Sequence, residues 1–85
     1  MGETGMTLTE AIAHRLMELC EERHITLNKM STICGMTQST LNNIVNTGSN
    51  NPTVSTVKKV CDGLGISLAQ FFDAPVFTSL EQEIQ

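Results

Sequence analysis

The sequence has few of the residues that build a large core or a reactive site. It contains no tryptophan, no tyrosine and only three phenylalanines among its 85 residues. We find no phosphate-cradling glycine loop, no paired acid–base motif and no nucleophile elbow. The many serines and threonines stand at expected helix starts, where capping explains them. The sequence therefore offers no positive case for an enzyme, and we expect no catalytic residue and no cofactor.

Cysteine is also scarce, with only Cys20, Cys34 and Cys61. No pair has the spacing of metal ligands, and an odd number fits a disulfide framework poorly. Each cysteine falls on the apolar face of an expected helix, so we expect three reduced core thiols and no bound metal. Reduced thiols indicate the cytoplasm. The two histidines are isolated in the sequence, and we expect both to be inert.

Long apolar runs are absent as well. No stretch is long enough to span a membrane, and no basic start followed by an apolar segment suggests a signal peptide. A chain of 85 residues is enough for one domain with one small core. We therefore expect no membrane partner. The sequence shows no separate ligand domain, so we also expect no small-molecule effector.

Acidic residues are missing from the middle of the chain, although the net charge is -4. Residues 23–61 hold four basic side chains and no acid, whereas residues 1–22 and 62–85 are both acidic. The four basic residues are Arg23, Lys29, Lys58 and Lys59. Because salt screens charges beyond about 8–10 Å, attraction to phosphate depends on this local excess. The excess is small, so we expect modest nucleic-acid affinity that depends strongly on salt.

Residues 26–48 predict two short helices joined by a tight turn. Thr26 can cap the first helix, and Gly35 ends it, because glycine adopts a left-handed conformation most easily. Thr37 can cap the second helix, which is expected over residues 38–46. A helix, a glycine-centred turn and a polar second helix form the helix-turn-helix pattern.

The second of these helices has a polar face that carries no charge. At about 100° per residue, five polar side chains fall within an arc of about 140°. They are Gln38, Ser39, Asn42, Asn43 and Asn46. Leu41, Ile44 and Val45 lie on the other side, where they can pack into a core. Glutamine and asparagine suit base reading, because one amide both donates to and accepts from adenine. The alternative is a solvated polar face, for which glutamate and lysine would have better helix propensity.

The remaining sequence predicts three further helices. Thr7 and Glu10 have the spacing of a capping box, so a first helix is expected over residues 8–23. A fourth helix begins near Thr53 or Ser55. The apolar stripes expected on these two helices are Leu8, Ile12, Leu16, Leu19 and Cys20 on the first, and Val54, Val57, Val60, Cys61 and Leu64 on the fourth.

Gly63 and Gly65 are expected to end the fourth helix. Ser67 then caps a short fifth helix over residues 68–73, and Pro75 breaks it. Both Phe71 and Phe72 are expected to complete the core. The expected centre of that core is Leu16, Met30, Met36, Leu41, Ile44, Val57, Leu64 and Phe71.

Three segments follow from this pattern. Residues 1–6 are expected to form a flexible arm, residues 7–73 the helix-turn-helix domain, and residues 74–85 a tail. Four apolar tail residues have approximate helical spacing, and they either cover the core or contact another subunit. They are Val76, Phe77, Leu80 and Ile84.

Three motifs make a family likeness specific. They are GMTQSTL at residues 35–41, NPT at residues 51–53 and CDGLGISLAQFF at residues 61–72. The chain resembles the Cro/cI-type helix-turn-helix family, also called the XRE family, of lambda-repressor-like domains. The resemblance covers about residues 8–73. It implies an all-α, compact five-helix domain with the helix-turn-helix as helices two and three. It also implies sequence-specific binding to double-stranded DNA, as a repressor and usually a homodimer, with the helix over residues 38–46 in the major groove.

The resemblance implies roles for particular residues. It places Gln38, Ser39 and Asn43 at bases and nearby phosphates. It places Asn46 and the loop from Ser49 to Thr53 near the DNA backbone. The family often has a phosphate-binding glutamine where this sequence has Leu27, so that contact is lost or moves to Asn28 or Lys29. The candidate DNA contacts are therefore Asn28, Lys29, Thr37, Gln38, Ser39, Asn42, Asn43, Asn46, Ser49, Asn50 and Asn51.

Two other functions fit the same fold. One is the DNA-binding antitoxin of a toxin–antitoxin pair, which regulates its own synthesis. The other is a protein-interaction module, such as an anti-repressor or assembly factor, in which the polar helix contacts protein. The acid-free block over residues 23–61 favours DNA over a role limited to protein.

Overall fold

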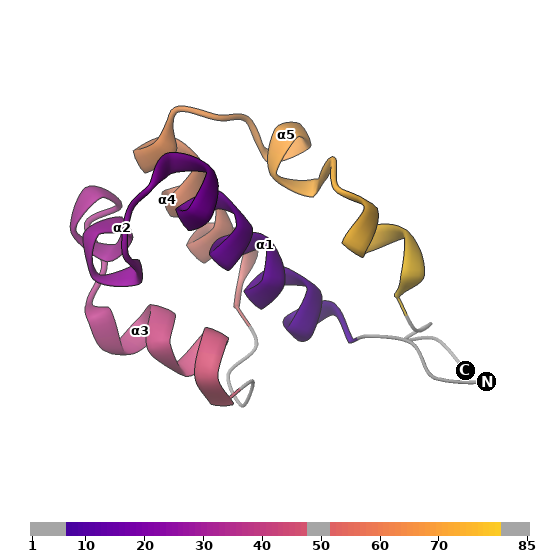
Figure 1. The fold of residues 1–85 in the computed structure, drawn as a ribbon, viewed down its shortest axis with the longest axis horizontal. Helices are drawn as coiled ribbons and strands as arrows, with labels where there is room; N and C mark the ends of the chain where they lie inside the picture. The colour runs from indigo at the N-terminus through magenta and orange to yellow at the C-terminus, as the bar shows by residue number, and fades with distance from the viewer. Residues whose placement is uncertain (1–6, 48–51, 81–85) are drawn as a thin grey trace.

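The computed structural model describes residues 7–47 and 52–80, and its elements are helices joined by short turns (Figure 1). They are α1 (Leu8–Arg23), α2 (Leu27–Ile33), α3 (Gln38–Asn42), the π-helical turn η1 (Asn43–Thr47), α4 (Val54–Leu64), α5 (Leu68–Phe72) and the 3₁₀ turn η2 (Pro75–Ser79). This order confirms the expected all-α fold of five helices, with α2 and α3 as the helix-turn-helix. The expected arm over residues 1–6 lies outside the described residues.

Every α-helix begins at a hydroxyl side chain. The hydroxyl accepts a hydrogen bond from the backbone N–H three residues later, at 3.0 to 3.3 Å. The capping residues are Thr7, Thr26, Thr37, Thr53 and Ser67. Glu10 and Gln70 complete two capping boxes by accepting from the backbone N–H of the capping residue. These caps fix the helix starts that the sequence predicted.

The turn between α2 and α3 depends on Gly35, as predicted. Its φ of +68° is in the left-handed region, and the N–H of Met36 donates to the carbonyl oxygen of Ser31 at 2.9 Å. The left-handed glycine and this hydrogen bond end α2 and turn the chain toward α3. The prediction for Gly63 was wrong in part, because Gly63 lies inside α4 and only Gly65, with φ +72°, ends that helix.

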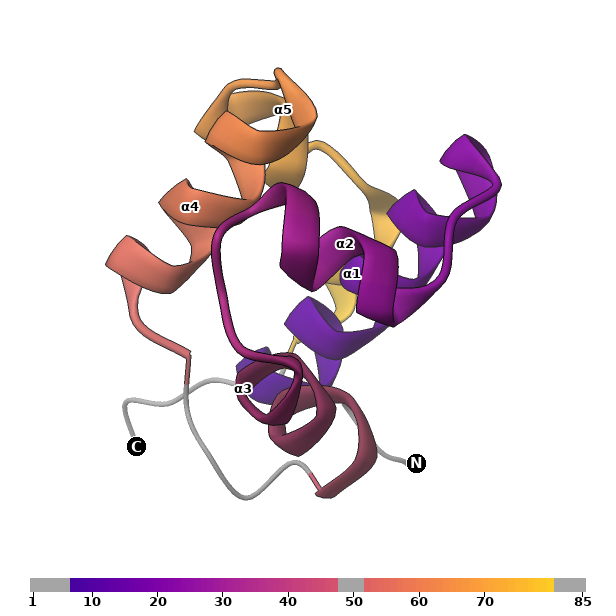
Figure 2. The same ribbon diagram turned by 90° about the vertical axis from the view of Figure 1, so that its left-hand side faces the viewer.

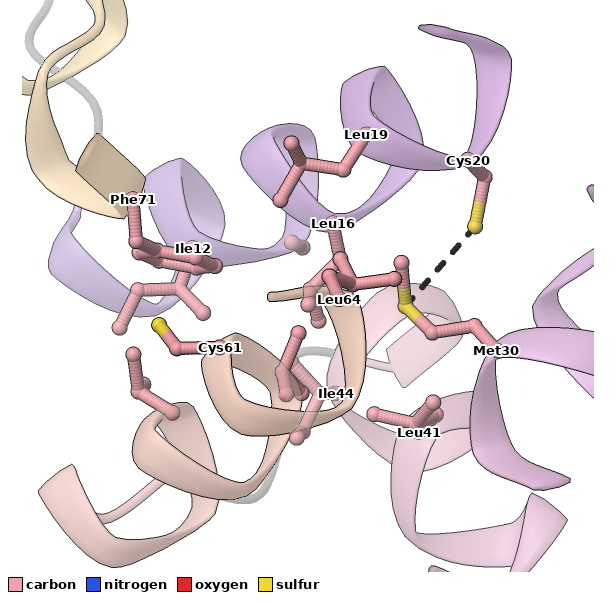
Figure 3. Close-up of a cluster of buried hydrophobic side chains, with 13 residues drawn as sticks. Ile12, Leu16, Leu19, Cys20, Met30, Leu41, Ile44, Cys61, Leu64 and Phe71 are labelled. Carbon is pink, nitrogen blue, oxygen red and sulfur yellow. Dashed lines mark hydrogen bonds between the residues drawn. The ribbon is translucent and has the colours of Figure 1, made fainter. Parts of the chain in front are cut away.

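All five α-helices and η1 contribute to one apolar core, which Figure 3 shows around Leu16 and Met30. The buried core residues are Ile12, Ala13, Leu16, Leu19, Cys20, Met30, Leu41, Ile44, Val57, Val60, Cys61, Leu64 and Phe71. Seven of the eight residues expected at its centre are buried. The exception, Met36, is only partly buried and packs against the cluster.

Three other apolar residues are more exposed than expected. Val54 is 71% exposed, and Leu8 and Phe72 are each 39% exposed. Val54 and Leu8 are the first residues of their helices, so the apolar stripe continues past the edge of the core. Phe72 directly follows the fully buried Phe71, and consecutive helix residues point about 100° apart.

The tail folds back onto α1, so that α3 and η2 lie on opposite sides of that helix in Figure 1. The ring of Phe77 lies 4.9 Å from the ring of Phe72 and 6.2 Å from that of Phe71, measured between centroids. Phe77 is partly buried against the core. Of the two alternatives for the tail, Phe77 therefore covers the core. Ile84 lies outside the described residues.

Candidate nucleic-acid interface

Helix α3 lies at an edge of the molecule in both ribbon views (Figures 1 and 2). Leu41 and Ile44 are 0% and 2% exposed, so they anchor α3 and η1 in the core. At the N-terminus, the Thr37 hydroxyl accepts from the N–H of Thr40 at 3.3 Å and lies 2.8 Å from the Thr40 hydroxyl. The position of α3 is therefore fixed by its cap and by its apolar side.

The opposite side of this segment is exposed and polar. Gln38, Ser39, Asn43 and Asn46 are all exposed, as the predicted arc requires. Asn42 is only half-buried, so it lies at the edge of this face rather than in its middle. Four uncharged side chains that can both donate and accept hydrogen bonds are thus presented together. We call these four residues the amide face.

The helix after Asn42 differs from the prediction. Regular α-helix was expected as far as Asn46, but residues Asn43–Thr47 form the π-helical turn η1. A π turn has i→i+5 hydrogen bonds and is rare, often occurring at functional sites. It packs against α1, with Ile44 in the core. Asn43 and Asn46 remain exposed, although a wider turn changes their angular spacing.

The candidate residues of α2 lie on a helix that contacts α3. Asn28 and Lys29 are both exposed. The main chain of Asn28 is engaged, since its carbonyl oxygen accepts from the hydroxyls of Ser31 and Thr32 at 2.8 and 3.2 Å. Three further candidates, Ser49, Asn50 and Asn51, lie outside the described residues.

Thr40 was not among the predicted contacts, and it is also exposed, next to Ser39 on α3. The sequence predicts a role for Thr40 only in the cap of α3, and its N–H does donate to the Thr37 hydroxyl. Its own hydroxyl lies 2.8 Å from that of Thr37. Its position three residues before Asn43 could have indicated it, since residues three apart share a helix face.

The positive charge predicted for residues 23–61 is partly neutralised in the structure. Lys58 forms an ion pair with Asp62 one turn further along α4, and both side chains are more than half exposed. Within the described part of the chain, Lys59 and Lys29 make no ion pair. Asp62 therefore offsets part of the positive charge that the sequence places in residues 23–61.

The three cysteines are free, and Cys20 and Cys61 are buried while Cys34 is half-buried. Burial raises the pKa of all three thiols above the ordinary value, because a thiolate is poorly solvated there. For Cys34, the other two cysteines raise the pKa further. Among residues 7–47 and 52–80, no group of three or more His, Cys, Asp and Glu side chains could hold a metal ion. None of the helices described has the length and apolarity of a membrane span.

Comparison with known proteins agrees with the helix-turn-helix fold. The model of the HTH_3 helix-turn-helix family matches residues 16–71, about two thirds of the chain. The solved structure of the prophage Lp1 protein 11 is 39% identical to the chain, with a TM-score of 0.75. The match covers 87% of this chain and 97% of that protein.

A second solved structure, an HTH_3 family transcriptional regulator from Vibrio cholerae, is 28% identical with a TM-score of 0.71. That match covers 80% of this chain but only 38% of the regulator. This chain therefore corresponds to one part of that longer protein. No curated protein matches the chain.

Proposed function

We propose, because this chain belongs to the HTH_3 helix-turn-helix family, that it is a sequence-specific DNA-binding regulator of transcription. The observation that carries the proposal is the amide face, which is exposed on a segment held by two buried anchors. A major groove of about 12 Å admits a helix. The family membership and the Vibrio cholerae regulator support the same function.

In this proposal the residues of α3 and η1 have different tasks. Gln38, Ser39 and Asn43 read base edges, and Asn46 contacts the DNA backbone. Asn42 contributes from the edge of the face, and Thr37 positions the helix through its cap. On α2, Asn28 and Lys29 bind phosphate. Phosphate contacts fix the protein on the duplex, whereas base contacts give specificity.

The regulator acts as a repressor and as a homodimer in this proposal. A single helix reads few base pairs, and two copies on half-sites about 34 Å apart would read twice as many. Sedimentation of the protein with an operator duplex tests the dimer. A strict one-to-one complex that saturates on a single half-site would contradict it. A cytoplasmic location also suits three unpaired cysteines.

The function is tested with DNA selected from random sequences and with the variant Asn43→Ala. An amide at this position can make two hydrogen bonds to adenine, so its loss should cost about 1–3 kcal/mol on the selected site. Binding to a scrambled duplex should change little. The salt dependence should also stay the same, because no charge is removed.

The matched control is Asn28→Ala, which removes the same side chain from α2. It should weaken both duplexes about equally, since phosphate contacts carry no sequence information. Thermal unfolding of both variants checks that the fold is intact. If Asn43→Ala weakens both duplexes equally, Asn43 does not read bases. If the unmodified protein binds neither duplex at low salt, the protein-interaction function replaces DNA binding.

A further inference from the structure

A pocket of about 310 Å³ lies between α1 and η2. Its lining is a single stripe of α1 together with one residue of η2. These residues are His14, Met17, Glu18, Glu21 and Val76. The α1 members are spaced i, i+3, i+4 and i+7, so they lie along one face of the helix. No residue of α3 or η1 lines this pocket, and η2 and α3 lie on opposite sides of α1 in Figure 1.

The apolar side chains of the pocket are Met17 and Val76. Met17 is 41% exposed, and Val76 is half-buried. Val76 is followed by Phe77, whose ring contacts the exposed ring of Phe72. Methionine is flexible and polarisable, so it adapts to different apolar partners. The surface can therefore receive an apolar side chain from another molecule.

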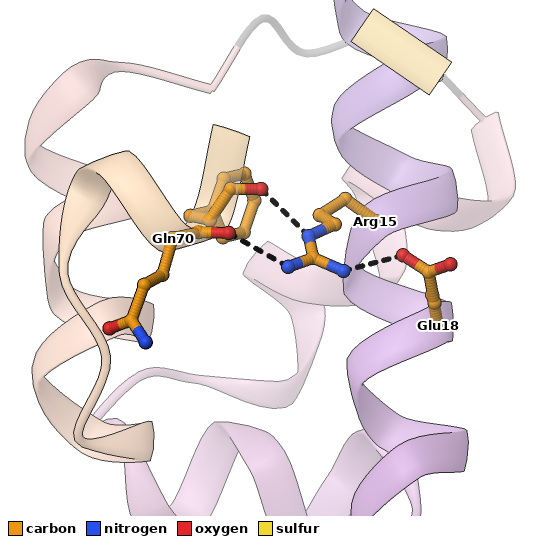
Figure 4. A network of polar contacts seen from close by, with 4 residues as sticks. Arg15, Glu18 and Gln70 are labelled. Atoms are coloured by element: carbon orange, nitrogen blue, oxygen red, sulfur yellow. Dashed lines mark hydrogen bonds and ion pairs between the residues drawn. The ribbon is translucent and has the colours of Figure 1, made fainter. Parts of the chain in front are cut away.

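The charged part of the pocket is acidic. Glu18 accepts a hydrogen bond from Arg15, but the Arg15 side chain is only 11% exposed and also donates to two carbonyl oxygens of α5 (Figure 4). Within the described residues, Glu21 makes no ion pair and is exposed. A cationic group that enters the pocket would thus meet the carboxylate of Glu21, with the carboxylate of Glu18 that Arg15 already binds nearby, beside an apolar patch.

This charge decides which molecule fits. DNA is excluded, because phosphate would approach the two glutamates. A second copy is disfavoured, since a two-fold contact places the same patch on itself and would bring glutamates together. We propose that the pocket binds a short segment of another protein, with an apolar side chain over Met17 and Val76 and a lysine or arginine at Glu21 and Glu18. A volume near the lower limit of small-molecule sites suits one or two side chains.

The proposal is tested by titrating isotope-labelled protein with three short synthetic peptides and following its NMR spectrum. The first peptide carries leucine and lysine on one face, the second has serine for leucine, and the third has glutamate for lysine. Only the first should bind, and the shifted resonances should include those of His14, Met17, Glu21 and Val76. Met17→Ser and Glu21→Gln should each weaken binding about tenfold.

Two matched controls are available in the chain. Ile33 is also 41% exposed but lies on α2, so Ile33→Ser should leave peptide binding unchanged. Glu22 neighbours Glu21 but does not line the pocket, so Glu22→Gln should also have no effect. Thermal unfolding checks that each variant is folded. Asn43→Ala should bind the peptide normally, which separates this proposal from DNA binding.

Three outcomes would overturn the proposal. One is that the first peptide does not bind, and another is that the control variants weaken its binding as much as the pocket variants do. The third is that the protein self-associates in sedimentation and Met17→Ser abolishes the association, which would make a second copy the occupant.

Discussion

Gly63 and Cys34 touch where α4 packs against α2. A Cβ atom at Gly63 would lie 2.6 Å from the Cys34 Sγ and 2.9 Å from its Cα. The Cys34 thiol also donates a weak hydrogen bond to the carbonyl oxygen of Val60 at 3.7 Å. Cys34 is the C-cap residue of α2. The contact therefore holds the end of α2, where the turn of the helix-turn-helix begins, against α4.

We predict that Gly63→Ala destabilises the protein although alanine is the better helix former. The gain in helix propensity is at most about 1 kcal/mol, whereas an extra methyl in a filled contact costs about 1–3 kcal/mol. The net loss should be visible as a lower free energy of unfolding in chemical denaturation. Gly65→Ala is the control for backbone strain alone, because its Cβ would meet nothing within 4 Å. Unchanged or higher stability in Gly63→Ala would show that α2 and α4 separate easily here.

The buried thiols predict a loss of stability in alkali. Burial raises the pKa of Cys20 and Cys61 in the folded chain, while the unfolded chain keeps the ordinary value of 9.0. Above that pH the unfolded state releases protons that the folded state retains, so the free energy of unfolding falls as pH rises. Urea denaturation at a series of pH values measures this. The double variant Cys20→Ala, Cys61→Ala should lose part of the pH dependence, and an equal dependence would assign it to other groups.

At this scale the sequence predicts some residues better than others. The positive φ at Gly35 could be predicted from the local sequence, because the end of one helix and the cap of the next lie within three residues of each other. The role of Gly63 could not be predicted, because a side chain there would collide with Cys34, which is 29 positions away in the sequence. Likewise, periodicity placed Val54 on an apolar stripe but could not show where the core ends.

Among the elements, α5 is the shortest α-helix together with α3, and its end depends on α1. The Arg15 Nε donates to the carbonyl oxygen of Phe71 at 2.7 Å, and another guanidinium nitrogen donates to that of Gln70 at 2.8 Å (Figure 4). A short helix leaves most of its last carbonyls without an internal partner. Arg15 therefore caps α5 from a different helix.

We predict that Arg15→Met costs about 1.5–3 kcal/mol, the range for hydrogen bonds to charged groups. Methionine keeps the length of the side chain but removes the donor to the carbonyl oxygen of Phe71, whereas the carbonyl oxygen of Gln70 still accepts from the N–H of Asp73 at 3.3 Å. The loss should appear in thermal unfolding and as faster amide hydrogen exchange in α5 than in α1. Glu18→Gln is the control, because it removes only the ion pair with Arg15, at an exposed site worth at most about 1 kcal/mol. Equal losses in the two variants would show that the ion pair, not the cap, matters.

The sequence predicted the helix starts well for a local reason. Each cap is a hydroxyl followed three residues later by the N–H that it accepts from, so all the information lies within four residues. The π turn η1 and the cap by Arg15 depend on tertiary packing, which no local pattern records. The candidate site shows the same division. Its amide face was predicted, but the half-buried position of Asn42 follows from how α3 docks on the core.

Across the whole molecule, the acidic and basic residues have different surroundings. The pocket between α1 and η2 is lined by Glu18 and Glu21, whereas exposed Lys29 lies on α2, which contacts α3. Attraction to phosphate therefore depends on where these charges lie and not on the net charge of the chain alone.

The ion pair of Lys58 with Asp62 makes this idea testable. An exposed pair of this kind is worth about 0–1 kcal/mol, so phosphate can replace Asp62 as the partner of Lys58. Asp62→Asn removes the competing carboxylate. We predict tighter binding at low salt to the selected and the scrambled duplex alike, with an unchanged ratio between them. If Lys58 gains a phosphate contact, the salt slope should steepen by about 0.9.

Titrations of both duplexes at several salt concentrations measure these quantities, and Asp73→Asn at the end of α5 controls for net charge. If Asp73→Asn has the same effect, the change reflects total charge; if neither variant changes binding, Lys58 does not approach phosphate.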